Sequence, residues 1–386
     1  MSGFVLARGL SGLPKAGVRG LQALAAVYKT TGEPQQVVEV VERTIPDDSK
    51  SLGQGQVVVQ MLAAPVNPSD LNQIEGKYPV RGTFSSMQIG DQSIQAAVGG
   101  NEGVGEVVQV GHDVTGLQAG DWVVPQQAGV FGTWCTHAVA GASGLLRIPR
   151  AWREKVRPVD VACLKVNSST AYRLLRDFVG LQPGDYVIQN GANSAVGRAV
   201  IQLARNWGIR TINVVRERAE GGGLLAQQLR ALGADMVVTD TQLSDKDTAR
   251  EIKALEPRLG LNCVGGRATM LMTKLIGPNG KLVSYGGMSG KPVSMPTSLL
   301  LFKNISAHGF WMNRWYDQAL KDAALGEEQL RMWEDILAMT SKKQFTPEPV
   351  ALEQWPVGSL QQTQELVATA VAWGSPKTVF TFGPSA

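Results

Sequence analysis

The sequence of 386 residues contains few of the residues that build disulfides, metal knots or membrane spans. Its three cysteines lie far apart without a Cys-x-x-Cys pair, which excludes a disulfide framework and a cysteine-rich zinc knot and fits a reducing compartment. No apolar run approaches the roughly 18 residues that cross a bilayer, so we expect no membrane span. A hydrophobic content of 44% excludes a disordered chain, and the length favours two compact domains.

The first 32 residues have no acidic side chain before Glu33, yet they carry Arg8, Lys15, Arg19 and Lys29. These four charges equal the formal net charge of +4, so the remaining chain is balanced and gives no indication of nucleic-acid binding. On a helical wheel the leucines form a stripe opposite the basic residues: Leu6, Leu10, Leu13, Leu21 and Leu24. The pattern predicts a mitochondrial transit peptide over residues 1–26 and a mature protein of the mitochondrial matrix, with a disordered basic tail as the alternative.

Two different apolar patterns follow one another along the chain. Short apolar runs separated by turns predict antiparallel strands at 57–61, 103–110, 122–125, 135–139 and 145–148. From residue 181, strands alternate with helical stretches in the βαβ manner, with strands at 186–189, 211–215, 236–238, 260–263, 281–285 and 305–309. Helices are predicted at 196–207, 224–232, 267–275, 329–341 and 360–372, and a further apolar run at 350–355.

Six parallel strands make one complete dinucleotide-binding unit. The final apolar segment, 377–382, has no nucleotide unit to join, so we expect it to return to the first domain. The predicted fold class is therefore α/β, with a six-stranded parallel Rossmann sheet inserted into a β-rich catalytic domain. The predicted boundaries are 27–165 and 315–386 for the two catalytic pieces and 166–314 for the nucleotide-binding domain.

The loop after the first strand of the second domain stands where dinucleotide folds carry Gly-x-Gly-x-x-Gly. It reads Ala192-Asn193-Ser194-Ala195-Val196-Gly197, and only the last glycine is in register. Small side chains at Ala192 and Ser194 still let backbone N–H groups approach a pyrophosphate at a helix N-terminus. The loop favours nucleotide binding over a purely structural joint between strand and helix.

The end of the second strand indicates which nucleotide is bound. NAD enzymes carry an acidic residue there to accept hydrogen bonds from the ribose 2′-hydroxyl, whereas this chain has Arg216, followed by Glu217 and Arg218. An arginine paired with a 2′-phosphate makes charge-assisted hydrogen bonds of ~1.5 to 3 kcal/mol, about a tenfold to hundredfold preference. The sequence therefore predicts NADPH as cofactor, with a solvated loop in which Glu217 pairs with the arginines as the alternative.

Several longer motifs resemble one family. They are LAAPVNPSD at 62–70, GGNEG at 99–103, VIQN at 187–190, RTINVVR at 210–216, LNCVGG at 261–266, YGGM at 285–288 and GFW at 309–311. Together they resemble the mitochondrial trans-2-enoyl-thioester reductases of type II fatty acid synthesis, within the medium-chain dehydrogenase/reductase superfamily. The resemblance covers most of the chain after the basic leader and implies a GroES-like catalytic domain around the Rossmann domain.

The resemblance implies that Tyr78, within Gly76-Lys77-Tyr78-Pro79, is the catalytic tyrosine. A phenol with a pKa of ~10 stays protonated and supplies the proton once hydride has added to Cβ of an enoyl thioester. From the residues alone, packing is the alternative. The resemblance also implies that NADPH is surrounded by Asn167, Asn193, Ser194, Ala195, Val196, Arg216, Arg218, Tyr285, Gly286, Gly287, Met288, Phe310, Trp311, Met312, Asn313 and Lys377.

Zinc-dependent alcohol dehydrogenases of this superfamily present a Gly-His-Glu turn where this chain has Gly100-Asn101-Glu102. Asparagine is a poor zinc ligand, so we expect no metal. The resemblance implies a homodimer through strand 305–309 and an enoyl thioester on acyl carrier protein or CoA as substrate. The chain departs from the family by an insertion over 81–95, and a zinc-free NADPH quinone reductase and a non-catalytic nucleotide-binding module are the alternatives.

Overall fold

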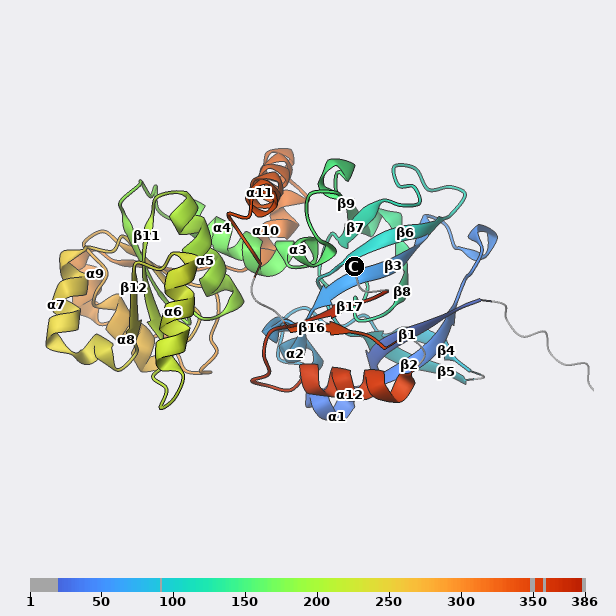
Figure 1. The fold of residues 1–386 in the computed structure, drawn as a ribbon, viewed down its shortest axis with the longest axis horizontal. Helices are drawn as coiled ribbons and strands as arrows, with labels where there is room; N and C mark the ends of the chain where they lie inside the picture. The colour runs from blue at the N-terminus through green and yellow to red at the C-terminus, as the bar shows by residue number, and fades with distance from the viewer. Residues whose placement is uncertain (1–19, 91, 348–350, 357–358, 384–386) are drawn as a thin grey trace, which may run out of the picture.

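The computed structural model describes residues 20–90, 92–347, 351–356 and 359–383. Figure 1 shows an α/β body on one side and a β-rich body on the other, with four helices lying between them. These are α3 (Pro158–Ala162), α4 (Ser169–Arg176), α10 (Met312–Ala319) and α11 (Ala323–Ser341). No helix of this described part is long and apolar enough to cross a membrane.

The α/β body is a six-stranded parallel sheet in the order β12-β11-β10-β13-β14-β15. Its strands are β10 (Tyr186–Asn190), β11 (Arg210–Val215), β12 (Met236–Thr239), β13 (Leu259–Asn262), β14 (Lys281–Ser284) and β15 (Ser306–Gly309). All six predicted strands are confirmed to within one or two residues. The helices are α5 (Ala195–Asn206), α6 (Gly222–Leu232), α7 (Lys246–Ala254), α8 (Gly266–Thr273) and α9 (Thr297–Lys303).

Sequence reasoning missed α7. Of its nine residues only Ile252 is buried, so the helix lacks the apolar period on which the other predictions depend. Its start is fixed instead by Asp245, whose side chain accepts hydrogen bonds from the backbone N–H groups of Asp247 and Thr248. A polar helix can therefore be found here from its N-cap more readily than from its hydrophobicity.

The β-rich body contains a seven-stranded sheet along the path β16-β17-β3-β6-β7-β9, with β8 paired to β3. Its strands are β3 (Gln56–Pro65), β6 (Val104–Val110), β7 (Trp122–Pro125), β8 (His137–Gly141), β9 (Leu145–Arg147), β16 (Ala351–Gln354) and β17 (Thr378–Thr381). The pairing of β17 with β3 shows that the chain returns to its first domain after the nucleotide unit, as expected. α12 (Leu360–Ala370) covers β2 (Val38–Ile45), beside the short helix α1 (Pro34–Val37).

The N-terminal edge of this body corrects part of the predicted helical stripe. β1 (Leu21–Tyr28) pairs along its whole length with β2 (Val38–Ile45) and buries Ala23, Ala25 and Ala26 completely. Leu21 and Leu24 therefore lie in a strand, where side chains alternate between faces, and not on a helical stripe. A leader that ends at residue 26 would divide β1, and this boundary stays a prediction; residues 1–19 lie outside the described residues.

The segment predicted as an insertion folds as a hairpin against this same edge. β4 (Ser85–Ile89) pairs antiparallel with β5 (Gln92–Val98), and the end of β5 pairs with β1. The hairpin follows α2 (Pro68–Ile74) and the loop that carries Tyr78. It therefore extends the small sheet β2-β1-β5-β4.

Candidate active site

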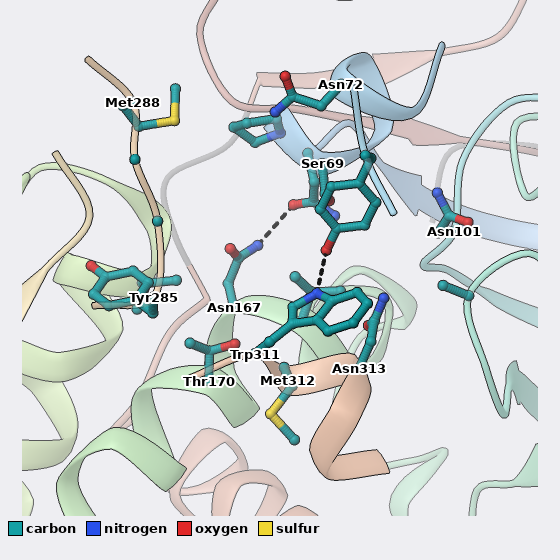
Figure 2. Close-up of a pocket in the computed structure, with 18 of the residues that line it drawn as sticks. Ser69, Asn72, Asn101, Asn167, Thr170, Tyr285, Met288, Trp311, Met312 and Asn313 are labelled. Carbon is teal, nitrogen blue, oxygen red and sulfur yellow. Dashed lines mark hydrogen bonds between the residues drawn. The ribbon is translucent and has the colours of Figure 1, made fainter. Parts of the chain in front are cut away.

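A cavity of about 800 Å³ opens between the two bodies. Eleven of the seventeen predicted site residues line it: Tyr78, Asn167, Val196, Tyr285, Gly286, Gly287, Met288, Phe310, Trp311, Met312 and Asn313. Figure 2 shows Tyr285 and Met288 on one side of this space and Asn101 on the other, with Trp311 between them. Residues distant in the sequence therefore form one site where the loops after β14 and β15 face the β-rich body.

Tyr78 and Trp311 meet in the cavity from opposite bodies. The indole Nε1 of Trp311 donates a hydrogen bond to the phenol oxygen of Tyr78 over 2.7 Å, drawn as a dashed line in Figure 2. The two rings stand nearly perpendicular, at 83°, with centroids 6.0 Å apart. Because an indole N–H is only a donor, the phenol is the acceptor in this contact and keeps its own proton for another partner.

The environment of Tyr78 keeps its phenol protonated. Burial raises its pKa from the ordinary value of 10.0, the hydrogen bond from Trp311 opposes that rise, and the negative charge of Asp70 adds to it. The loop that carries Tyr78 is fixed by its own backbone, because the N–H groups of Lys77 and Tyr78 both donate to the carbonyl oxygen of Asn72. The site thus presents a neutral O–H from a well-held loop.

A buried carboxylate supports the floor of the cavity. Glu102 is 1% exposed and accepts hydrogen bonds from the side-chain amide of Asn67 (2.9 Å) and the backbone N–H of Val166 (2.6 Å). The Asn67 carbonyl in turn accepts from Asn167 at 2.9 Å and from the Lys377 ammonium. This relay places Asn167 at the cavity wall and shows that Glu102, where zinc enzymes carry the ligand turn, serves here as a hydrogen-bond acceptor.

A second buried carboxylate holds Asn101. Asp70 is fully buried and accepts hydrogen bonds from Asn101 Nδ2 (2.8 Å) and the backbone N–H of Asn67 (2.8 Å). Asn101 Nδ2 also donates to Gln73 Oε1 over 2.8 Å, and Asn101 Oδ1 accepts from the Gly129 N–H. Burial raises the pKa of both Asp70 and Glu102, against the hydrogen bonds and the Lys377 charge that lower it.

The loop before α5 has the geometry of a phosphate-binding turn. Ser194 is the N-cap of α5, and its hydroxyl accepts a hydrogen bond from the Gly197 N–H at 3.1 Å. A Cβ at Gly197 would lie 2.7 Å from the backbone of Ala192, so only glycine allows the helix to approach the strand this closely. Asn193, Ser194 and Ala195 do not line the cavity; they belong to this turn, next to Val196, which does.

The predicted 2′-phosphate residues lie at the end of β11. Arg216 and Arg218 are exposed, and neither forms an ion pair with any residue in the described ranges. Glu217, the partner in the alternative interpretation, instead accepts a hydrogen bond from the Thr241 hydroxyl at 2.6 Å. Both guanidinium groups are therefore available to the phosphate of a ligand.

Sequence reasoning missed several residues that line the cavity. They are Asn67, Pro68, Ser69, Asn72, Glu75, Lys77, Asn101, Ala128, Lys165, Val166, Thr170, Ser289, Gly290 and Trp373. Asn67, Pro68 and Ser69 lie within the motif at 62–70, so the resemblance of that motif to the family could have indicated them as site residues. Nothing in the sequence pattern marks Lys165 or Trp373, which reach the cavity only through tertiary packing. Lys377, in contrast, lies behind the wall, where its ammonium contacts Asn67 and the Val66 carbonyl.

Potential metal ligands do not gather in the part of the chain that the structure describes. No three side chains of His, Cys, Asp or Glu there stand together as a metal site would require. The three cysteines, Cys135, Cys163 and Cys263, are all buried.

Comparisons with known proteins agree with this geometry. Two family models match the chain, "Alcohol dehydrogenase GroES-like domain" over residues 53–150 and "Zinc-binding dehydrogenase" over 195–325. Among solved structures, the heterodimer of the mitochondrial 2-enoyl thioester reductases Etr1p and Etr2p from Candida tropicalis matches with a TM-score of 0.83 and 33% identity, over 94% of this chain and 100% of that one. A structure of Etr1p with NADP and crotonyl-CoA matches with a TM-score of 0.82 over the same shares.

Sequence identity to known enzymes identifies the family of this chain. The mitochondrial enoyl-acyl-carrier-protein reductase of Xenopus tropicalis is 43% identical over 85% of this chain and 88% of its own length. The enzyme of the same description from Arabidopsis thaliana is 42% identical over 86% of this chain and 83% of its own length. The fold, the cavity and these identities together show that the chain belongs to the family of mitochondrial enoyl-acyl-carrier-protein reductases.

Proposed function

We propose that this protein reduces trans-2-enoyl thioesters to saturated acyl thioesters with NADPH. When bound in the cavity, NADPH would supply the hydride for Cβ of the substrate. The proton from Tyr78 Oη goes to Cα, and the phenolate that remains is protonated again from water. Proton donation by a positioned side chain contributes about 10² to 10⁴ in rate.

The hydrogen bond between Trp311 and Tyr78 carries this proposal. Since the indole N–H occupies a lone pair of the phenol oxygen, the O–H of Tyr78 remains free to point into the cavity. The raised pKa of Tyr78 keeps that proton in place until negative charge develops on the substrate. Both features favour proton transfer to a carbanion-like atom, as enoyl reduction requires.

The proposed cofactor site follows the predicted residues. Asn167, Tyr285 and the chain from Phe310 to Asn313 surround the space next to Tyr78, where the nicotinamide would lie. The turn of Asn193, Ser194, Ala195 and Val196 would hold the pyrophosphate. Arg216 and Arg218 would receive the 2′-phosphate, while Gly286, Gly287 and Met288 line the cavity next to Tyr285 in the sequence. Lys377 would act on the cofactor site indirectly, because its ammonium donates to Asn67 Oδ1, which also accepts from Asn167.

The natural carrier of the acyl group is proposed to be acyl carrier protein, with CoA as an alternative carrier. The relatives from Xenopus tropicalis and Arabidopsis thaliana are named enoyl-acyl-carrier-protein reductases, which supports this choice of carrier. A comparison of kcat/KM for one enoyl group on the two carriers tests this choice, and a large preference for CoA would overturn it.

A homodimer through the edge of the nucleotide-binding sheet is also proposed. β15 is an outer strand of that sheet, and α9 beside it exposes Leu300, Leu301 and Phe302 at 44%, 69% and 83%. Covering such a patch on association is favourable. Light scattering should find a dimer in the unchanged protein and a monomer in Phe302→Glu. The control Leu330→Glu, on α11, should remain dimeric.

The basic segment before β1 is proposed to direct the protein to the mitochondrial matrix. It is rich in Arg and Lys and free of acid, and a leader that spares β1 ends before Leu21. A fluorescent protein fused to residues 1–20 should enter the matrix. Cytosolic fluorescence would contradict the proposal.

A substrate panel tests the proposed activity. Purified protein should oxidise NADPH rapidly with trans-2-enoyl-CoA of medium chain length and only slowly with quinones. The opposite order would identify a quinone reductase. Tight NADPH binding without turnover of either class would identify a non-catalytic nucleotide-binding module.

A further inference from the structure

Lys165 is a buried cation in the cavity to which the proposed reaction assigns no role. It lies in the short π-helix η4 (Leu164–Ser168), two residues before Asn167, and its side chain is only 4% exposed. It nevertheless lines the same cavity as Tyr78 and Trp311. Fully buried lysines are rare unless they are paired.

The surroundings of Lys165 leave its ammonium without a direct counterion. Its Nζ lies 5.3 Å from the ring centroid of Tyr316, a cation–π contact. Within the described ranges, no carboxylate stands within 4.0 Å of Nζ, and no acceptor receives a hydrogen bond from it. Glu102 and Asp317 act on it only through their charge.

Both of those carboxylates already have partners. Glu102 accepts hydrogen bonds from Asn67 and Val166, and Asp317 accepts one from the Gln127 amide at 2.9 Å. Burial lowers the pKa of Lys165 to about 8, which leaves the amine mostly protonated at neutral pH. An ammonium has three hydrogen-bond donors. Those of Lys165 have no acceptor among the described residues and can donate to a ligand in the cavity.

The position of Lys165 indicates which part of the substrate it meets. It packs against Tyr316, which is 2% exposed and is itself covered by Trp333, so this end of the cavity is closed by protein. Two other lining residues, Met288 and Trp373, are 57% and 43% exposed, so the cavity meets solvent beside them. A carrier too large to enter must stay at the exposed end, so the acyl chain extends towards Lys165.

We propose that Lys165 is a specificity-determining residue that receives a carboxylate at the far end of the acyl chain. This inference rests on the proposed enoyl reduction and names its substrate class: thioesters of enoic acids that carry a second, terminal carboxylate. A terminal methyl group would instead leave the ammonium desolvated and unpaired, which is unfavourable.

The test pairs substrates that differ only at the chain end. Each trans-2-enoyl-CoA in a series of increasing length is compared with the analogue whose terminal methyl is replaced by a carboxylate. At the best-fitting length, kcat/KM should favour the carboxylate by about tenfold to a hundredfold in the unchanged protein, the effect of one charge-assisted hydrogen bond. Lys165→Met should abolish or reverse this preference, and Lys165→Arg should retain part of it.

Lys155→Met is the matched control. Its Nζ also lies over an aromatic ring, 5.4 Å from the centroid of Trp152, but it does not line the cavity. This variant should keep the selectivity of the unchanged protein. Binding of the saturated analogues to the NADP⁺-bound protein, measured by calorimetry, should show the same dependence on position 165 without requiring turnover.

Three outcomes separate the possibilities. Equal kcat/KM for both chain ends at every length would overturn the inference and leave enoyl reduction intact. An equal loss for both substrates in a folded Lys165→Met protein would assign Lys165 to catalysis or structure and not to selection. Absence of turnover with every enoyl thioester, while calorimetry still shows carboxylate selectivity, would contradict the proposed reaction and spare the binding site.

Discussion

The two sides of the cavity hold their polar residues in opposite ways. On the β-rich side, Asp70 and Glu102 are buried and engaged in hydrogen bonds that fix Asn101 and Asn67. On the nucleotide side, the predicted phosphate ligand Arg216 is exposed and has no ion pair within the described residues. Buried groups determine the shape of a site before any ligand arrives, whereas exposed cations gain most of their interaction energy when the ligand supplies the opposite charge.

The largest effect on activity should come from substitution of Tyr78, whose phenol meets Trp311 between the two sides of the cavity. Tyr78→Phe removes the O–H and keeps the ring, so NADPH affinity should stay unchanged while kcat with an enoyl thioester falls about 10² to 10⁴-fold. Steady-state kinetics together with fluorescence titration of NADPH separate the two quantities. Tyr186→Phe, which alters a phenol outside the cavity lining, is the control and should retain full activity. Full activity of Tyr78→Phe would remove the proposed proton donor.

Removing a buried hydrogen-bond acceptor on the β-rich side of the cavity should reduce the stability of the protein. Asp70→Ala leaves the Asn101 amide and the Asn67 N–H without their acceptor, and each buried donor left unpaired costs about 1 to 3 kcal/mol. Urea denaturation should therefore show a lower free energy of unfolding. Asp247→Ala, at an exposed ion pair with Arg250, is the control and should change stability by less than about 0.5 kcal/mol. Similar small effects for both would show that the network does not stabilise the fold.

The buried carboxyl group of Asp70 should also make the free energy of unfolding depend on pH. Burial raises the folded-state pKa of Asp70 above its ordinary value of 3.8. The contribution of this group to stability is therefore fully present below pH 3.8 and is lost as the pH rises through the raised pKa. Asp70→Asn, which keeps the shape and stays neutral, should flatten this part of the curve of unfolding free energy against pH. An unchanged curve would mean that Asp70 does not titrate in this range.

Substitution of the exposed Arg216 on the nucleotide side should weaken cofactor binding and leave the stability of the protein unchanged. Arg216→Ala should weaken NADPH binding about tenfold to a hundredfold, because one charge-assisted pair with the 2′-phosphate is lost. NADH has no such phosphate, so its weaker binding should stay the same. The control Arg250→Ala removes another exposed arginine, which lies on α7 and pairs with Asp247, and should leave both affinities unchanged. An equal loss for NADPH and NADH would assign Arg216 another role.

The sequence predicted the parts of this protein that depend on local pattern. The six parallel strands lie where apolar runs alternate with helical stretches, because a strand buried on both faces requires such a run. The return of residues 378–381 to the first domain followed from a strand without a nucleotide unit to join. The error at the N-terminus had a local cause too: the apolar residues of β1 suit a helical wheel as well as a strand, and only the pairing with β2 decides between them.

What the sequence alone determined is the class of fold, the order of its units and the arginines at the end of β11, since each is a property of neighbouring residues. Only the tertiary structure decided that Trp311 donates to Tyr78, that Asp70 holds Asn101, and that the Lys165 ammonium is enclosed in the cavity. These contacts join residues up to 233 positions apart. Their formation depends on how the two bodies pack, which no period or spacing along the chain encodes.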